Sequence, residues 1–169
     1  TIRGDTYAFG PWVSADDAPS AAECPPGRVP VDCRADVEFS ADRTFSDGIT
    51  LHNGYRGTPT DSQGCTLFAD GSYVQRMRAT CSARYSEVRP VFPPSQGDDG
   101  STVQSGMLQT PPCPAGFEPL RCFCHSPWRS CGLKINFEPE SNGTCLSAAG
   151  GRRRLQMMCG RRTLPATSA

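Results

Sequence analysis

The chain has 169 residues with 17 basic and 17 acidic side chains, and it contains ten cysteines. An even and high cysteine content predicts five disulfides and an oxidising compartment, which means a secreted or cell-surface protein. The balanced total charge makes a nucleic-acid binder a poor match, and no stretch is apolar enough to span a membrane. Seventeen glycines and sixteen prolines, spread along the chain, argue against long helices and favour an all-β fold.

The charge is not evenly distributed between the two halves. Residues 1–112 hold nine Arg and fourteen acidic residues, which gives a net charge of −5. Residues 113–169 hold seven Arg, one Lys and three acidic residues, which gives +5. The second half is therefore the part expected to meet an anionic surface. Because the sequence begins at Thr1 without Met, we expect a processed piece of a secreted precursor.

Residues 1–84 are predicted to form a first cysteine-rich β module with an N-terminal strand. The stretch of residues 6–13, which is rich in aromatic side chains, supplies that strand, and a polar segment then leads to Cys24. In residues 73–81, one face of the strand holds Tyr73, Met77, Ala79 and Cys81, and the other holds Val74, Arg76, Arg78 and Thr80. This alternation is typical of a half-buried strand, so Met77 is predicted to be in the core.

Residues 85–112 are rich in proline and glycine and are predicted to be a linker. Residues 113–162 are predicted to form a second cysteine-rich β module, and residues 163–169 a disordered tail. Leu155 takes the place in the second module that Met77 takes in the first.

The two modules are predicted from an internal repeat. Residues 24–33 read CPPGRVPVDC and residues 113–122 read CPAGFEPLRC, so both fit the pattern C-P-x-G-x-x-P-x-x-C. Each copy holds four cysteines in a shared order, and the second copy has an extra pair. Spacing alone does not select the connectivity. We favour nested pairing, first with fourth and second with third, because it clips both ends of each repeat. The resulting prediction is Cys24–Cys81, Cys33–Cys65, Cys113–Cys159, Cys122–Cys145 and, for the extra pair, Cys124–Cys131.

The cysteine spacing and the strand of residues 73–81 resemble the repeated modules of the C-terminal Cys/His-rich domain of proprotein convertase subtilisin/kexin type 9. They are also similar to the β-rich C-terminal domain of apicomplexan perforin-like proteins. The resemblance covers both repeats and implies small antiparallel β-sandwich modules with nested disulfides. It further implies binding to protein surfaces or membranes without chemistry. Ser82 and Gly160 stand where the convertase modules have a second adjacent cysteine, and only two repeats are visible here.

No catalytic pattern such as G-x-S-x-G or H-E-x-x-H occurs, so we expect a protein that is not an enzyme and needs no cofactor. His52 and His125 are isolated and are interpreted as ordinary loop residues. Cys122, Cys124 and His125 lie close in sequence, but no C-x-x-C pair occurs, so we predict no metal site.

The predicted contact surface lies in the second module. The loop between Cys124 and Cys131 has no counterpart in the first copy and presents Trp128 and Arg129, residue types enriched at binding hot spots. The alternative is that Trp128 packs into its own module. If neither loop nor basic residues bind, the aromatic segment of residues 7–12 is the next candidate. Arg152, Arg153 and Arg154 form a basic cluster, which either contacts an anionic glycan or lipid or is a solvated face.

The sequon Asn142-Gly143-Thr144 sits on a predicted turn and makes Asn142 the candidate glycosylation site. Taken together, these features predict an extracellular recognition module that binds a protein, glycan or membrane surface within a larger secreted or surface protein. One alternative is the membrane-targeting domain of a pore-forming protein. The other alternative is a structural repeat of an extracellular matrix or filament protein.

Overall fold

The computed structural model of the chain describes residues 4–13, 19–37, 50–53, 63–68, 74–97, 102–125, 131, 136–148 and 150–164. Within these residues the regular structure is twelve β-strands and one 3-10 turn, Pro94–Gln96. Every strand pairing between named strands is antiparallel, so the predicted all-β class is confirmed. The predicted tail begins with the described residues Thr163 and Leu164, and its remainder lies outside the described part.

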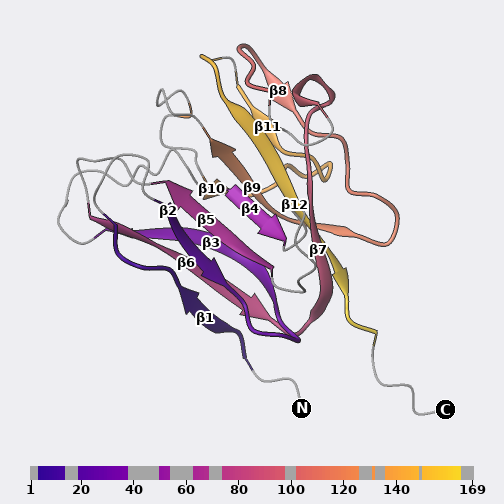
Figure 1. The fold of residues 1–169 in the computed structure, drawn as a ribbon. Helices are drawn as coiled ribbons and strands as arrows, with labels where there is room; N and C mark the ends of the chain where they lie inside the picture. The colour runs from indigo at the N-terminus through magenta and orange to yellow at the C-terminus, as the bar shows by residue number, and fades with distance from the viewer. Residues whose placement is uncertain are drawn as a thin grey trace.

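The first repeat forms two three-stranded sheets with the orders β1-β6-β3 and β2-β5-β4 (Figure 1). The strands are β1 Thr6–Phe9, β2 Pro19–Glu23, β3 Val29–Val37, β4 Thr50–Asn53, β5 Gln63–Phe68 and β6 Gln75–Ser82.

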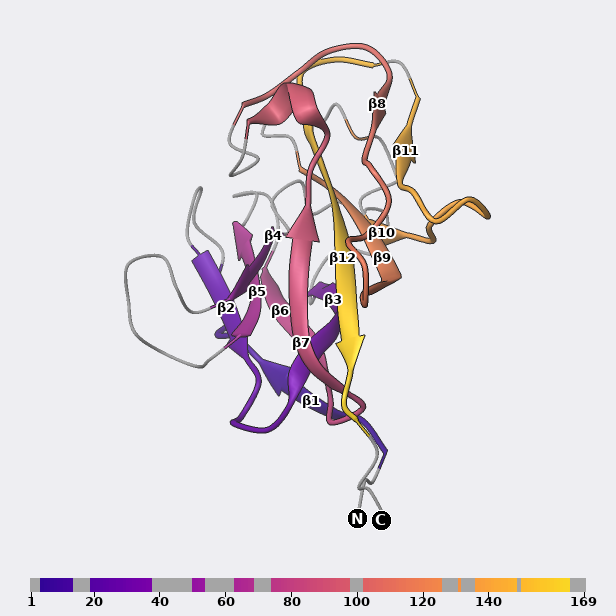
Figure 2. The same ribbon diagram turned by 90° about the vertical axis from the view of Figure 1, so that its right-hand side faces the viewer.

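The second repeat forms a four-stranded sheet, β10-β9-β12-β7, and a two-stranded sheet, β11-β8. Figure 2 shows β7 and β12 running side by side along the molecule. The strands are β7 Tyr85–Val91, β8 Leu108–Gln109, β9 Glu118–His125, β10 Asn136–Phe137, β11 Leu146–Ser147 and β12 Arg154–Arg162.

The predicted linker is wrong over its first part, because residues 85–91 form the edge strand β7 of the second large sheet. Tyr85 and Val88 are buried there, while Ser86 and Arg89 are exposed. Pro90 does not break this strand, because proline is tolerated at an edge position whose N–H makes no ladder hydrogen bond. The second structural unit therefore begins before Cys113.

All five predicted disulfides are present, and no described cysteine is free. The two repeats also share their backbone details. Gly27 and Gly116 both have φ near +86°, a conformation that glycine adopts without strain, in the turn that precedes the long strand. Each copy also has a β-bulge at the residue that follows the second proline of the shared C-P-x-G-x-x-P-x-x-C pattern. The bulged residue, which is left out of the ladder register, is Val31 in β3 and Leu120 in β9. Such a bulge at matching positions shows that β3 and β9 share this local backbone geometry.

The matched strands also share their buried faces, as the sequence predicts. Met77 lies opposite Ala35, and Leu155 lies opposite Cys124 at the corresponding step of the ladder. Met77 and Leu155 are both fully buried. In β6 the burial alternates strictly, with Arg76 and Arg78 on the outer face, so the predicted phase of this strand is confirmed.

The two units pack against each other through the large sheet of the second repeat. Leu155, Met157 and Cys159 on one face of β12 belong to the core of the second repeat. Met158 on the other face joins Phe123 in the core cluster of the first repeat. At the margin of this contact, the Asn136 side chain donates hydrogen bonds to Asp32 and to the Cys33 carbonyl oxygen. One face of the second sheet is therefore covered by the first unit.

Candidate functional site

The loop predicted to bind a partner lies mostly outside the described residues. Trp128 and Arg129 belong to this undescribed part, whereas His125 and the Cys124–Cys131 disulfide that closes the loop are described. The two readings of Trp128, contact residue or internal packing, both stay predictions.

The predicted basic cluster is divided by the fold. Arg152 is exposed and Arg154 is half-buried at the start of β12, and both make interactions of their own. Arg153 is only 1% exposed. Its guanidinium donates to the carbonyl oxygens of Gly106 at 2.7 Å and Gly151 at 2.9 Å, and to the Ser147 hydroxyl at 2.8 Å.

The prediction that Arg153 belongs to the contact surface is therefore wrong, because its side chain is buried. Buried polar groups need partners, and here the guanidinium supplies the donors for carbonyl groups of the surrounding turns. Its backbone also exchanges two hydrogen bonds with Gln104, which fixes the segment that leads into β12. The side chain thus ties these segments together and is not accessible to an outside partner.

His125 lies at the end of β9, opposite Arg154 in the ladder. Burial, and secondarily the charge of Arg154, lower the pKa of His125 to about 4. Its Nδ1 atom has no hydrogen-bond partner. His125 is thus neutral near pH 7 in the folded chain. The side chain of the other histidine, His52, lies outside the described side chains.

A different surface brings together exposed rings and guanidinium groups. Tyr7, Phe9 and Trp12 are 59%, 49% and 43% exposed, which places them among the most exposed large apolar side chains described. The Arg76 guanidinium lies 4.1 Å from the centre of the Phe9 ring and 4.7 Å from that of Trp12. Arg78 lies 5.4 Å from the Tyr7 ring. We call these five residues, Tyr7, Phe9, Trp12, Arg76 and Arg78, the aromatic–arginine face.

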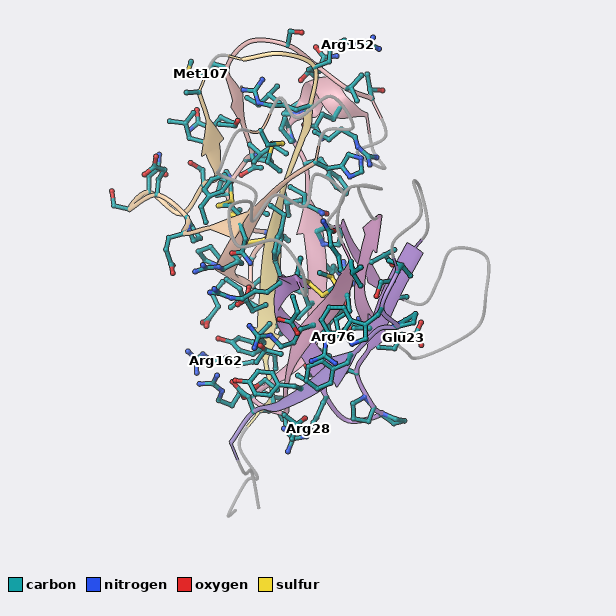
Figure 3. All side chains as sticks on the ribbon, turned by 90° about the vertical axis from the view of Figure 1, so that its left-hand side faces the viewer. Glu23, Arg28, Arg76, Met107, Arg152 and Arg162 are labelled. Atoms are coloured by element: carbon teal, nitrogen blue, oxygen red, sulfur yellow. A yellow bond between two sulfur atoms is a disulfide. The ribbon has the colours of Figure 1, made fainter. Side chains whose placement is uncertain are left out.

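The strand pattern of β1 and β6 builds this face. Alternation along β1 turns Tyr7 and Phe9 outward while Ala8 packs against the first core. The antiparallel register sets Phe9 opposite Arg78, so rings and guanidinium groups from two distant segments become neighbours. Figure 3 shows Arg76 in the lower half of the molecule, far from Arg152 at the opposite end.

An acidic residue of β3 holds the arginines in place. Asp36 lies opposite Arg76 in the ladder and accepts a hydrogen bond from its Nε atom at 3.0 Å. The second carboxylate oxygen of Asp36 lies 3.7 Å from Nε of Arg78. A guanidinium held by both a carboxylate and aromatic rings has few rotamers left to lose when a partner binds.

The second repeat has exposed arginines that are balanced by acidic partners. Arg89 and Arg161 both lie 5.3 Å from the Phe117 ring and both pair with Glu87. Farther along, Arg162 pairs with Glu118, and hydrogen bonds from Arg162 and then from Tyr85 lower the pKa of Glu118. Paired surface charges of this kind contribute little attraction for an anionic partner.

The predicted acceptor Asn142 lies exposed on a turn in which the Gly143 N–H donates to the Glu140 carbonyl at 2.9 Å. The Asn142 side-chain oxygen accepts from the Thr144 N–H at 3.1 Å and from its hydroxyl at 2.7 Å. The sequon therefore forms a compact surface turn, and its glycosylation stays a prediction.

Among the described residues, no group of three or more His, Cys, Asp or Glu side chains is arranged to hold a metal ion. Within the same residues, no helix has the length and apolar character needed to cross a membrane. Comparison with protein-family models, curated proteins and solved structures finds no match to this chain. The resemblance to the convertase and perforin-like domains therefore stays a prediction from the cysteine spacing.

Proposed function

We propose that this chain is a non-catalytic recognition module of an extracellular protein, and that the aromatic–arginine face is its contact surface for a partner protein. The observation that supports this most is the position of Arg76 beside both Phe9 and Trp12, with its Nε atom bound to Asp36. Tyr, Trp and Arg are the residue types that dominate binding hot spots in protein–protein interfaces. Because these side chains are already ordered, their binding costs little conformational entropy.

A protein partner fits the charges of this face better than an anionic membrane or a sulfated glycan does. Arg76 and Arg78 share Asp36, and Arg34 on the same face pairs with Asp32 at 2.8 Å. The positive charge available for a polyanion is therefore largely balanced within the face. Apolar rings beside arginines that already have acidic partners are typical of protein–protein interfaces, in which an aromatic-rich core is surrounded by a polar rim.

The disulfides support the extracellular compartment in this proposal. Five bridges in a chain of 169 residues are compatible with an oxidising environment outside the cell. The predicted resemblance to convertase and perforin-like C-terminal domains agrees with a recognition role. The membrane-targeting role remains as a rival outcome of the experiment below, whereas a structural role in a matrix would show as concentration-dependent assembly of the chain.

The experiment compares three probes with one set of variants of the full, oxidised chain. The probes are extracellular fluid from the source, heparin, and vesicles of phosphatidylcholine with phosphatidylserine. The variants are Arg76→Ala, which removes the centre of the face, and Arg89→Ala, which removes an exposed ring-stacked arginine elsewhere. Chemical cross-linking followed by mass spectrometry identifies the bound protein.

The proposal expects one protein to be captured by the wild type and by Arg89→Ala but lost with Arg76→Ala. Binding to heparin or vesicles that weakens with added salt, with no captured protein, would support the glycan or membrane role instead. Equal capture by all three chains would contradict the assignment of the face.

A further inference from the structure

The two large sheets have equivalent edge strands that differ in how they are protected. Tyr7 of β1 lies opposite Thr80, and Pro90 of β7 lies opposite Met158. Thr80 and Met158 occupy the same position in their repeats, one residue before the last shared cysteine. Tyr7 therefore stands where the second repeat has a proline.

Strand β7 has several features that prevent another strand from pairing with it. Pro90 has no N–H, Glu87 and Arg89 place charges along the strand, and two further prolines follow Phe92. Edge strands in natural proteins are commonly protected in this way against association. Strand β1 has neither a proline nor a charged residue among its four residues, which read TYAF.

Among the described strands, none pairs with the outer backbone groups of β1. The Gly10 N–H donates to the Met77 carbonyl oxygen at 2.9 Å. Because backbone groups alternate in direction along an antiparallel ladder, the N–H and C=O of Ala8 also point toward β6. Those of Tyr7 and Phe9 point away from β6. Within the described residues, β1 pairs with β6 alone and ends its sheet (Figure 1).

We propose that β1 of a second copy of the chain pairs with this edge. The two β1 strands run antiparallel and are related by a twofold axis that passes beside Ala8. In this register Tyr7 lies opposite Phe9 of the partner subunit, so the residues with outward N–H and C=O groups face each other. The strand is uncharged, so two copies do not repel each other there. Its neighbour Asp5 is already paired with Arg84 at 3.1 Å.

The side chains suit the same arrangement. Tyr7 and Phe9 of the partner subunit lie on one face as a direct cross-strand aromatic pair, a favourable combination in antiparallel sheets. On the other face the small side chain of Ala8 lies opposite its own copy. An interface in which the same patch serves both copies closes as a dimer and does not extend into a filament. All five residues of the aromatic–arginine face come from one chain, so a monomeric chain would leave the proposed function intact.

The test is sedimentation equilibrium of the full, oxidised chain from micromolar to millimolar concentration. Tyr7→Pro removes the outward N–H, and the proline already present at the matching position in β7 shows that this sheet position accepts it. Tyr7→Val is the matched control because it retains the N–H. We expect a concentration-dependent dimer for the wild type and for Tyr7→Val, and a dissociation constant at least tenfold weaker for Tyr7→Pro.

Amide exchange by NMR provides a second readout that needs no substitution. The amides of Tyr7 and Phe9 should become protected as the concentration rises, whereas the Ala8 amide should be protected throughout. A wild-type chain that stays monomeric over the whole range would overturn the proposal. Equal association of Tyr7→Pro and the wild type, or Tyr7 and Phe9 exchange that does not depend on concentration, would overturn it as well.

Discussion

Acidification should destabilise the folded chain through His125 before most carboxylates titrate. The unfolded side chain has a pKa near 6.5, and burial together with Arg154 lowers the folded value to about 4. Below pH 6.5 the unfolded state binds a proton that the folded state does not, so the free energy of unfolding falls as the pH falls toward 4. The difference between the two values corresponds to about 3 kcal/mol.

The assay is urea unfolding of the oxidised chain at closely spaced pH values between 7 and 4. In a thermal melt of a domain of this size, the full loss of about 3 kcal/mol would correspond to a melting temperature lower by roughly 6–12 °C. His125→Gln is the matched control because it stays neutral at every pH and should lose much less stability over this range. The lowered pKa of Glu118 contributes its own loss only at lower pH, as that carboxylate is protonated. If His125→Gln and the wild type lose the same stability between pH 6.5 and 5, the burial of His125 is not the cause.

Three further predictions concern the core, the buried arginine and the surface turn. Met77→Asp and Leu155→Asp should each lower the free energy of unfolding by several kcal/mol, because each places an unpaired charge in the core. Thr80→Asp on the outer face of β6 should cost far less. Similar melting curves for all three variants would disprove the strand phase. Arg153→Ala should lower the free energy of unfolding by about 1–3 kcal/mol, because the partly buried carbonyl groups of Gly106 and Gly151 lose their donor. A melting temperature unchanged from the wild type would contradict this role. When the chain is secreted from a glycosylating host, Asn142→Gln should remove a mass that peptide-N-glycosidase also removes, and identical masses would show that the sequon is not used.

The sequence predicted the features that depend on local spacing. The shared order of the cysteines was sufficient to propose the nested bridges, and period-two alternation was sufficient to place Met77 and Leu155 in the core. The glycine turn and the bulge after Pro30 repeat because the C-P-x-G-x-x-P-x-x-C pattern that builds them repeats.

The features that depend on register and on packing between distant segments were not predicted. The sequence suggests a linker where β7 lies, because Pro90 and its neighbours indicate a loop when their edge position is unknown. It also suggests that Arg153 is exposed like its neighbours, because a run of like residues does not show which member turns inward. The aromatic–arginine face required the pairing of β1 with β6, two strands more than sixty residues apart in the sequence. The signal in the sequence that points to this face is the alternation of Tyr7 and Phe9 within the aromatic-rich residues 6–13.

The most direct test of the central claim measures how strongly the partner protein binds to variants of the aromatic–arginine face. Phe9→Ala and Arg76→Ala should each weaken the affinity of the isolated partner by about thirtyfold, the equivalent of about 2 kcal/mol expected for a hot-spot residue. Arg89→Ala, which removes a ring-stacked arginine from the second sheet, should bind within about twofold of the wild type, because surface substitutions outside a contact have small effects. If Phe9→Ala and Arg76→Ala bind as the wild type does while Arg89→Ala does not, the contact surface lies on the second repeat and the account is wrong.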